Sequence, residues 1–226
     1  MIAAHVAAIA LTVSPARVEL TAGATQVVRI TNAGSAPAVL NVTRAGFALT
    51  LRGQPRIVAS KAAWLAFAPR RLVVGARGTA TVTVKARSLR LSPGDHPGLL
   101  LLTQRPVVRG GLAVRTRIGV VVSLRGPGRV VHRLVLNGAR VLGRRVRISL
   151  ANRGNVIELL SPASVTITVW RGSRLAARFH PAARELLPGA RGVIEVPYAG
   201  AKRPVSVQVV IQRSAARTVA RRSFAL

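Results

Sequence analysis

The sequence contains no cysteine, and aromatic residues make up only 3% of its 226 residues. Without cysteine, the chain can form no disulfide, no cysteine-ligated zinc site and no thiol nucleophile. With so few aromatic residues, its cores must be built mainly from Val, Leu, Ala and Ile. A hydrophobic content of 50% argues against a disordered chain, and the length allows one large domain or two of about 100 residues.

Acidic residues are also scarce, which limits the enzyme chemistry available to the chain. No two of the five lie close in sequence, so an acid–base pair for glycoside hydrolysis would need the fold to bring them together. The four histidines show no metal-ligand spacing. Asp95-His96 follows Pro93-Gly94, a pattern typical of a turn. No nucleophile elbow, phosphate loop or dinucleotide fingerprint is present. We therefore predict no enzymatic activity, no metal and no cofactor.

The charge is strongly one-sided, with 35 basic residues against five acidic ones and a formal net charge of +30. A field of this size favours an anionic partner. The arginines are nevertheless scattered along the chain, as they would be if they only solvated the outer faces of strands. Sequence-independent nucleic-acid binding remains an alternative, although neither a recognition helix nor an aromatic stacking platform is evident.

Short runs of alternating apolar and polar residues dominate the sequence and predict β-strands. In the run 79–85, Ala80, Val82 and Val84 would face a core, and Trp64 is also expected to be buried. The runs 144–150, 163–170 and 205–211 alternate in the same way. Their inward residues would be Val146, Ile148, Leu150, Val165, Ile167, Val169, Val205, Val207, Val209 and Ile211.

Turn signals separate these runs and suit a β-sandwich. Asn137-Gly138 and Arg171-Gly172 could each close a hairpin, and 112–124 reads as one long apolar strand. The one short helical candidate is 181–187.

One ordered pattern occurs twice. Thr31-Asn32-Ala33-Gly34-Ser35 has a counterpart in Ala151-Asn152-Arg153-Gly154-Asn155, and Gly75-Ala76-Arg77-Gly78 has one in Gly189-Ala190-Arg191-Gly192. The duplication predicts an all-β chain of two tandem sandwiches. Gly126-Pro127-Gly128 should end a sheet and separate a module 11–125 from a module 129–226. The segment 1–10 is apolar except for His5, and we interpret it as a truncated secretory signal, with an extra edge strand as the alternative.

The ordered motifs of the first module resemble those of a known family. They are Val13-Ser14-Pro15-Ala16-Arg17-Val18-Glu19-Leu20, Ile30-Thr31-Asn32-Ala33-Gly34, Trp64-Leu65 with Pro69, Leu91-Ser92-Pro93-Gly94-Asp95-His96-Pro97-Gly98, and Arg117-Ile118-Gly119-Val120-Val121-Val122. Over about residues 11 to 125 the chain is similar to the immunoglobulin-like N-terminal domain of periplasmic pilus chaperones. It is also similar to that of Gram-positive surface proteins with a peptidoglycan-binding immunoglobulin-like domain. The resemblance implies two tandem immunoglobulin-like β-sandwiches.

The resemblance also implies partner-binding residues. In the pilus chaperones, an arginine and a lysine grip the terminal carboxylate of a subunit. Arg17 resembles the arginine, whereas the place of the lysine falls on Gly119, with Arg117 two residues earlier on the same strand face. Val120, Val121 and Val122 form the candidate edge for β-strand addition, and ordinary pairing within the sandwich is the alternative for them.

We therefore expect a non-catalytic, secreted or cell-envelope protein. The leading interpretation is binding of an anionic wall polymer or of a surface-protein partner. The first alternative is an assembly chaperone that captures a client strand by β-augmentation, and the second is non-specific nucleic-acid binding.

Overall fold

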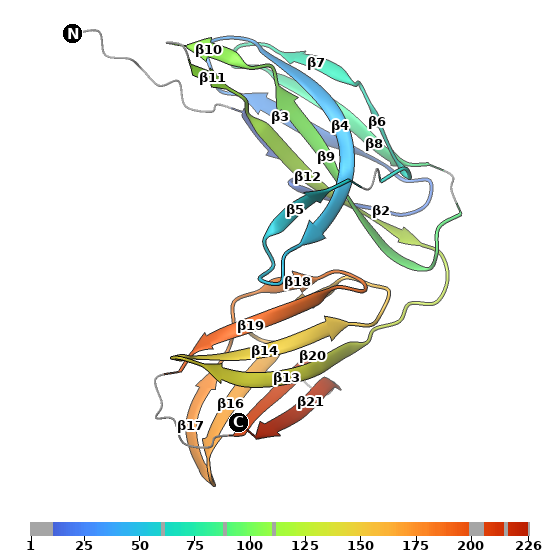
Figure 1. The fold of residues 1–226 in the computed structure, drawn as a ribbon. Coiled ribbons are helices and arrows are strands. Elements are labelled where there is room, and N and C mark those ends of the chain that lie inside the picture. Colours follow the sequence, from blue (N-terminus) through green and yellow to red (C-terminus); the bar gives the residue numbers. More distant parts are fainter. Residues whose placement is uncertain are drawn as a thin grey trace, which may run out of the picture. The chain divides into compact units, whose positions relative to one another are not determined.

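The computed structural model describes residues 11–59, 62–87, 90–109, 112–198, 206–214 and 217–225 (Figure 1). The regular secondary structure in these ranges is β-strand throughout, so the all-β prediction is confirmed. The expected signal segment 1–10 and Val205 lie outside the described residues. Within the described ranges, no helix is long and apolar enough to cross a membrane. The chain forms two compact units, one of residues up to Phe47 with Ile57–Gly128, the other of Ala48–Arg56 with the residues from Arg129 onward.

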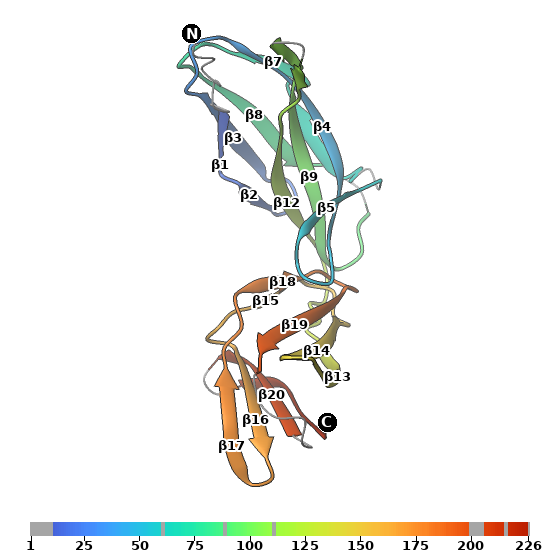
Figure 2. The same ribbon diagram turned by 60° about the vertical axis from the view of Figure 1, so that its left-hand side comes forward.

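The first unit is a sandwich of two sheets (Figure 2). One sheet has the order β1-β3-β8-β6, and the other has the order β2-β12-β9-β4-β5, with β7 also paired to β4. A small ribbon of β10 and β11 precedes β12. The strands are β1 (Leu11–Ser14), β2 (Arg17–Leu20), β3 (Thr25–Asn32), β4 (Ala38–Leu49), β5 (Pro55–Val58), β6 (Leu65–Ala68), β7 (Arg71–Val74), β8 (Thr79–Ala86), β9 (Gly94–Gln104), β10 (Val107–Arg109), β11 (Leu112–Val114) and β12 (Arg117–Gly126).

An aliphatic core lies between these two sheets. Alternation places Val82 and Val84 of β8 inside, fully buried, with Ala80 partly buried beside them, as predicted. Trp64 is 6% exposed and packs in the same cluster, so its predicted place in the core is confirmed. Buried apolar area on this scale is the dominant stabilising contribution to a sandwich that has no disulfide.

The chain passes from one sheet to the other between β1 and β2. β1 pairs antiparallel with β3, whereas β2 pairs parallel with β12. Pro15, preceded by a cis peptide bond, separates the two strands. Because of this switch, Arg17 becomes the first residue of β2 in the β12 sheet.

The second unit contains two main sheets and a short ribbon. Their orders are β13-β14-β19, β17-β16-β20-β21 and β15-β18. Val146, Ile148, Val165, Ile167, Val169, Val207 and Val209 are 0% exposed, and Leu150 and Ile211 are also buried, so the inward faces predicted for these runs are confirmed. The strands are β13 (Leu134–Leu142), β14 (Arg145–Asn152), β15 (Glu158–Leu160), β16 (Val165–Arg171), β17 (Arg174–Phe179), β18 (Arg184–Leu186), β19 (Arg191–Pro197), β20 (Ser206–Ser214) and β21 (Arg217–Ala225).

The duplicated asparagines have the same structural task in the two units. The amide of Asn32 donates to the carbonyls of Ala36, Val74 and Gly75, and its Oδ1 accepts from the N–H of Gly34. The amide of Asn152 donates to the carbonyls of Val156 and Leu186, and its Oδ1 accepts from the N–H of Gly154. Each buried side chain therefore ties the turn that follows its strand to a distant loop, which explains why the Asn-x-Gly pattern occurs twice.

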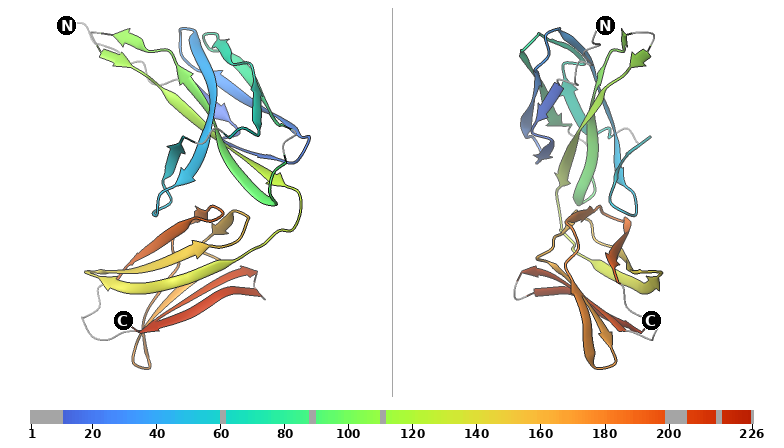
Figure 3. Two further views of the ribbon diagram at one scale, coloured as in Figure 1. Left: turned by 45° about the vertical axis from the view of Figure 1, so that its right-hand side comes forward. Right: turned by 90° about the vertical axis from the view of Figure 1, so that its left-hand side faces the viewer.

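Three predictions about local structure are wrong. The segment 181–187 is not helical, because Arg184–Leu186 forms β18 and pairs with β15. Asn137-Gly138 closes no hairpin, because it forms a bulge inside β13, and the chain turns at Gly143 instead. The run 112–124 is interrupted between β11 and β12 rather than forming one strand. The Arg171-Gly172 turn is confirmed, with Gly172 at a positive φ of 57° between β16 and β17, in the orange hairpin of Figure 3.

Candidate partner-binding face of the first unit

Arg17 lies beside the last long strand of the first unit. In the parallel pair of β2 and β12, Arg17 is in register with Val121, and Leu20 with Leu124. The N–H of Val121 donates to the carbonyl of Ala16 at 3.1 Å. Residues in register on neighbouring strands project to the same side of a sheet, so Arg17 and Val121 share a face.

The outer face of β12 follows from its alternation. Val120 and Val122 are 0% exposed and belong to the core, so the opposite face carries Arg117, Gly119 and Val121. Consequently the side chains of Val120 and Val122 are not available to a partner. The predicted contribution of these two residues is restricted to their main chain.

The part of β12 that lacks a second strand partner among the described residues lies earlier in the strand than the predicted edge at Val120–Val122. Strand β9 pairs with β12 from Arg117 to Gly126, and β2 pairs with its other side from Val121 to Leu124. Val121 and Val122 are therefore paired on both sides, and the prediction of an open edge at these two residues is wrong. Over Arg117–Val120, strand β9 is the only strand partner of β12 among the described residues. Unpaired main chain of this kind is a template for an added strand.

The surface around Gly119 is apolar and bordered by arginines. A Cβ at Gly119 would meet Leu99 Cδ2 at 3.6 Å and Leu101 Cδ2 at 3.7 Å, which is ordinary van der Waals contact. Arg117 is exposed and stands two positions before Gly119, about 7 Å away along the strand. Arg17 is half-buried at the other end of this stretch, beside Val121. The fold therefore places both predicted arginines on one face of the sheet. Along β12, Gly119 lies between Arg117 and Val121, the residue that Arg17 is paired with.

The Asp95-His96 pair has a structural explanation. Asp95 receives two hydrogen bonds from Arg125, from Nε at 2.6 Å and from Nη2 at 3.1 Å. This hydrogen bonding, aided by the negative charges of Asp95 and Glu19, raises the pKa of Arg125. The ring of His96 contacts the carbonyl of Ser92 instead, at 2.8 Å. Each member of the pair is thus engaged by a different group.

A second cluster of charged side chains was not predicted from the sequence. Glu195 in β19 is surrounded by Arg52, Arg145 and Arg147. The signal for two members was present, because Arg145 and Arg147 alternate with core residues along β14. Glu195 and Arg52 lie far from Arg145 and Arg147 in sequence. The pairing of β14 with β19 brings Glu195 to the two arginines, and the packing of the segment Ala48–Arg56 brings Arg52 to Glu195.

Comparison with known proteins yields structural likeness without sequence likeness. No protein-family profile matches the chain, and no curated protein sequence matches it. The class 5 fimbriae chaperone CfaA is 10% identical, with a TM-score of 0.57, over 95% of this chain and 98% of that chain. The YadV chaperone is 12% identical, with a TM-score of 0.54, over 96% and 100%. The CsuC–CsuE chaperone–adhesion subunit complex of Acinetobacter baumannii is 10% identical, with a TM-score of 0.52, over 95% and 97%.

This likeness covers almost the whole chain and shows its fold. The chain has the tandem immunoglobulin-like β-sandwich architecture of pilus chaperones. The expected similarity to Gram-positive surface proteins stays a prediction.

Proposed function

We propose that this protein is an exported, non-catalytic assembly chaperone that captures a strand of an envelope protein together with the free carboxylate at the end of that strand. The observation that carries the proposal is the start of β2. Arg17 stands where β2 begins to cover β12, directly after the stretch Arg117–Val120, which among the described residues pairs with β9 alone.

This arrangement limits how far a client strand can extend along β12. A strand added beside Arg117–Val120 has to stop where β2 begins, which is the position of Arg17. If the end at Arg17 is the carboxyl end, the added strand runs parallel to β12. Main-chain hydrogen bonds then supply affinity, and the guanidinium of Arg17 binds the terminal carboxylate through a charge-assisted pair.

Arg117 is the candidate for the second cation. It lies on the same face as Arg17 but at the far end of the stretch Arg117–Val120. At that level, it would contact the client strand several residues before its carboxyl end. The site therefore has one arginine for the carboxylate and one for the body of the strand.

The structural likeness favours this function over the other interpretations. The similar structures include chaperones bound to an adhesin subunit or to a pilin, as in the complex of SafA pilin with the SafB chaperone from Salmonella enterica. These complexes give no support to binding of an anionic wall polymer or of nucleic acid. For such a chaperone, we expect a location outside the cytoplasm, either secreted or in the cell envelope.

The proposal is tested by capture from the envelope fraction of the source organism. The wild-type chain should retain a defined protein client, and Arg17→Ala should lose it. Arg29→Ala is the matched control, because Arg29 is an exposed arginine of the first unit on the other sheet. Retention of the client by Arg17→Ala, or equal loss in both variants, would contradict the proposal.

A further inference from the structure

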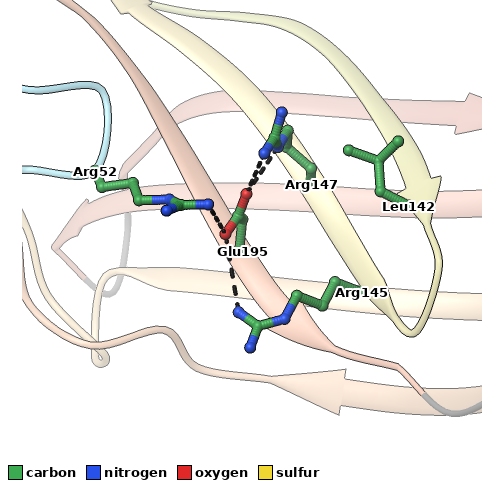
Figure 4. A pocket seen from close by; sticks show the side chains of 5 residues that line it. All are labelled: Arg52, Leu142, Arg145, Arg147 and Glu195. Atoms are coloured by element: carbon green, nitrogen blue, oxygen red, sulfur yellow. Dashed lines mark hydrogen bonds and ion pairs between the residues drawn. The ribbon is translucent and has the colours of Figure 1, made fainter.

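The sheet β13-β14-β19 of the second unit carries a groove on its outer face, with a volume of about 450 Å³ (Figure 4). The groove is lined by Arg52, Leu142, Arg145, Arg147 and Glu195. Arg52 comes from the segment Ala48–Arg56, which belongs to the same unit. The three arginines and one carboxylate give the lining a net positive charge.

Strand alternation explains why the two arginines of β14, Arg145 and Arg147, point outward. Val146 and Ile148 of β14 are 0% exposed in the core, so Arg145 and Arg147 project from the opposite face. Glu195 is in register with Arg147 on one side. Arg140 of β13 is in register with Arg147 on the other side. Two like charges directly opposite each other destabilise a strand pair, so this concentration of arginine has an energetic cost.

The two oxygens of Glu195 are used very differently. Arg147 donates to Oε1 from Nε at 2.8 Å, and its Nη2 lies 2.6 Å from the same oxygen. Oε2 is approached from two sides by Arg52 Nη2 at 3.4 Å and by Arg145 Nη1 at 3.8 Å (Figure 4). These contacts, with the hydrogen bond from Arg147 as the largest contribution, hold the pKa of Glu195 below its usual value.

Arg52 and Arg145 both approach Oε2 of Glu195, but neither makes a short contact with it. Their side chains are 65% and 67% exposed, whereas Glu195 is 14% exposed. At these distances and exposures, the two guanidiniums gain only a weak ion pair from Glu195. They remain positioned around a single point at the mouth of the groove, with most of their donors directed to solvent or to a ligand.

We propose that this groove is a binding site for a phosphate-bearing ligand, held between Arg52 and Arg145. A phosphate group carries more oxygens and more charge than a carboxylate, so one group can accept from two guanidiniums at once. Glu195 repels a phosphate, but the lining keeps a net positive charge because three arginines face this one carboxylate. Leu142, which is 41% exposed, offers an apolar wall to the part of the ligand next to the phosphate. This function is separate from strand capture by the first unit.

The test is calorimetric titration of the full chain with sodium tripolyphosphate at low ionic strength. Because the whole chain is strongly basic, a control of equal charge is essential. The site variant is Arg52→Gln with Arg145→Gln, and the control is Arg29→Gln with Arg71→Gln, two exposed arginines of the first unit. The site variant should bind at least about tenfold more weakly than wild type, and the control should stay within about twofold. Equal weakening in the two double variants would show attraction by the overall field and would overturn the proposal.

The variant Glu195→Gln provides a second test of the phosphate site. Removing the negative charge while keeping an oxygen for Arg147 should tighten tripolyphosphate binding, and unchanged or weaker binding would contradict the proposal. A titration with phosphatidylglycerol vesicles, and with phosphatidylcholine vesicles for comparison, identifies the source of the phosphate. Vesicle binding that the site variant abolishes supports a lipid headgroup, whereas tripolyphosphate binding without vesicle binding supports a soluble phosphate compound.

Discussion

Arg17 on β2 stands in register with Val121 on β12, in a parallel pair that begins at these two residues. Within the described part of the chain, this pairing marks the point where β12 changes from having one strand partner to having two. It also places a cation at that point. The proposed capture of a client strand depends on this coincidence, because the client's main chain and its terminal carboxylate would be recognised by adjacent parts of one face.

Gly119 offers a gain-of-function prediction. The sequence resemblance predicts that a lysine of the pilus chaperones corresponds to Gly119, and here a Cβ would lie in ordinary contact with Leu99 and Leu101. We expect Gly119→Lys to fold normally and to bind a client strand about tenfold more tightly, since a second cation would reach the carboxylate. Titration of the captured client into both proteins measures this. Gly119→Gln, of similar length without charge, is the control, and equal gains in the two variants would contradict an electrostatic explanation.

The buried asparagines should stabilise their own units. Asn152 is 0% exposed and Asn32 is 3% exposed, and each side chain donates to a main-chain carbonyl far away in sequence, Leu186 for Asn152 and Val74 for Asn32. Replacing either with Ala should cost about 1–3 kcal/mol of unfolding free energy, because buried main-chain groups lose their partners. Urea unfolding measures the loss. Exposed Asn41→Ala is the control and should change stability by less than about 0.5 kcal/mol.

Gly154 should tolerate no side chain. A Cβ at this position would overlap the carbonyl oxygen of Val131 and lie 2.8 Å from the main-chain nitrogen of Arg133. Gly154→Ala is therefore expected to destabilise the second unit by about 1–3 kcal/mol, since the main chain of residues 131–133 has to move away. Gly138→Ala is the matched control, because nothing lies within 4 Å of its Cβ position. Thermal unfolding of both variants checks the difference, and a harmless Gly154→Ala would refute the close approach of the 131–133 main chain to Gly154.

The ion pairs of Glu195 predict a pH dependence. The pKa of Glu195 is lowered in the folded chain, first by the hydrogen bond from Arg147 and then by the charges of Arg52, Arg147 and Arg145. Its contribution to stability is therefore complete above the unfolded-state pKa of about 4.3 and is lost as the pH falls through the lower folded-state value. The difference in unfolding free energy between wild type and Glu195→Gln should shrink steadily in that acidic range. A difference that stays constant would show that these ion pairs contribute no stability.

Strand identity was predictable from the sequence, whereas strand pairing was not. Alternation identified Val146, Ile148, Val165 and Ile167 as core residues because the side-chain period of a strand is two. The same local pattern cannot reveal which strand pairs with which. The open stretch of β12 was therefore predicted too far along the strand, since the point where β2 begins depends on the switch between sheets at Pro15.

Local turn chemistry also failed where tertiary pairing was stronger. Asn137-Gly138 has a favourable hairpin sequence, yet β13 continues through it as a bulge because Val141 and Leu142 still pair with β14. The Glu195 cluster escaped prediction for a related reason. Its carboxylate and Arg147 are 48 residues apart and meet only through the register of β14 and β19.

The most direct test of strand capture uses the carboxyl-terminal peptide of the captured client, synthesised once with a free carboxylate and once as the amide. Affinities of both peptides are measured for wild type, for Arg17→Ala and for the control Arg29→Ala. The account predicts that wild type and the control bind the free acid at least about tenfold more tightly than the amide, and that Arg17→Ala binds the two peptides equally. Equal binding of acid and amide by the wild-type chain would contradict carboxylate recognition by Arg17.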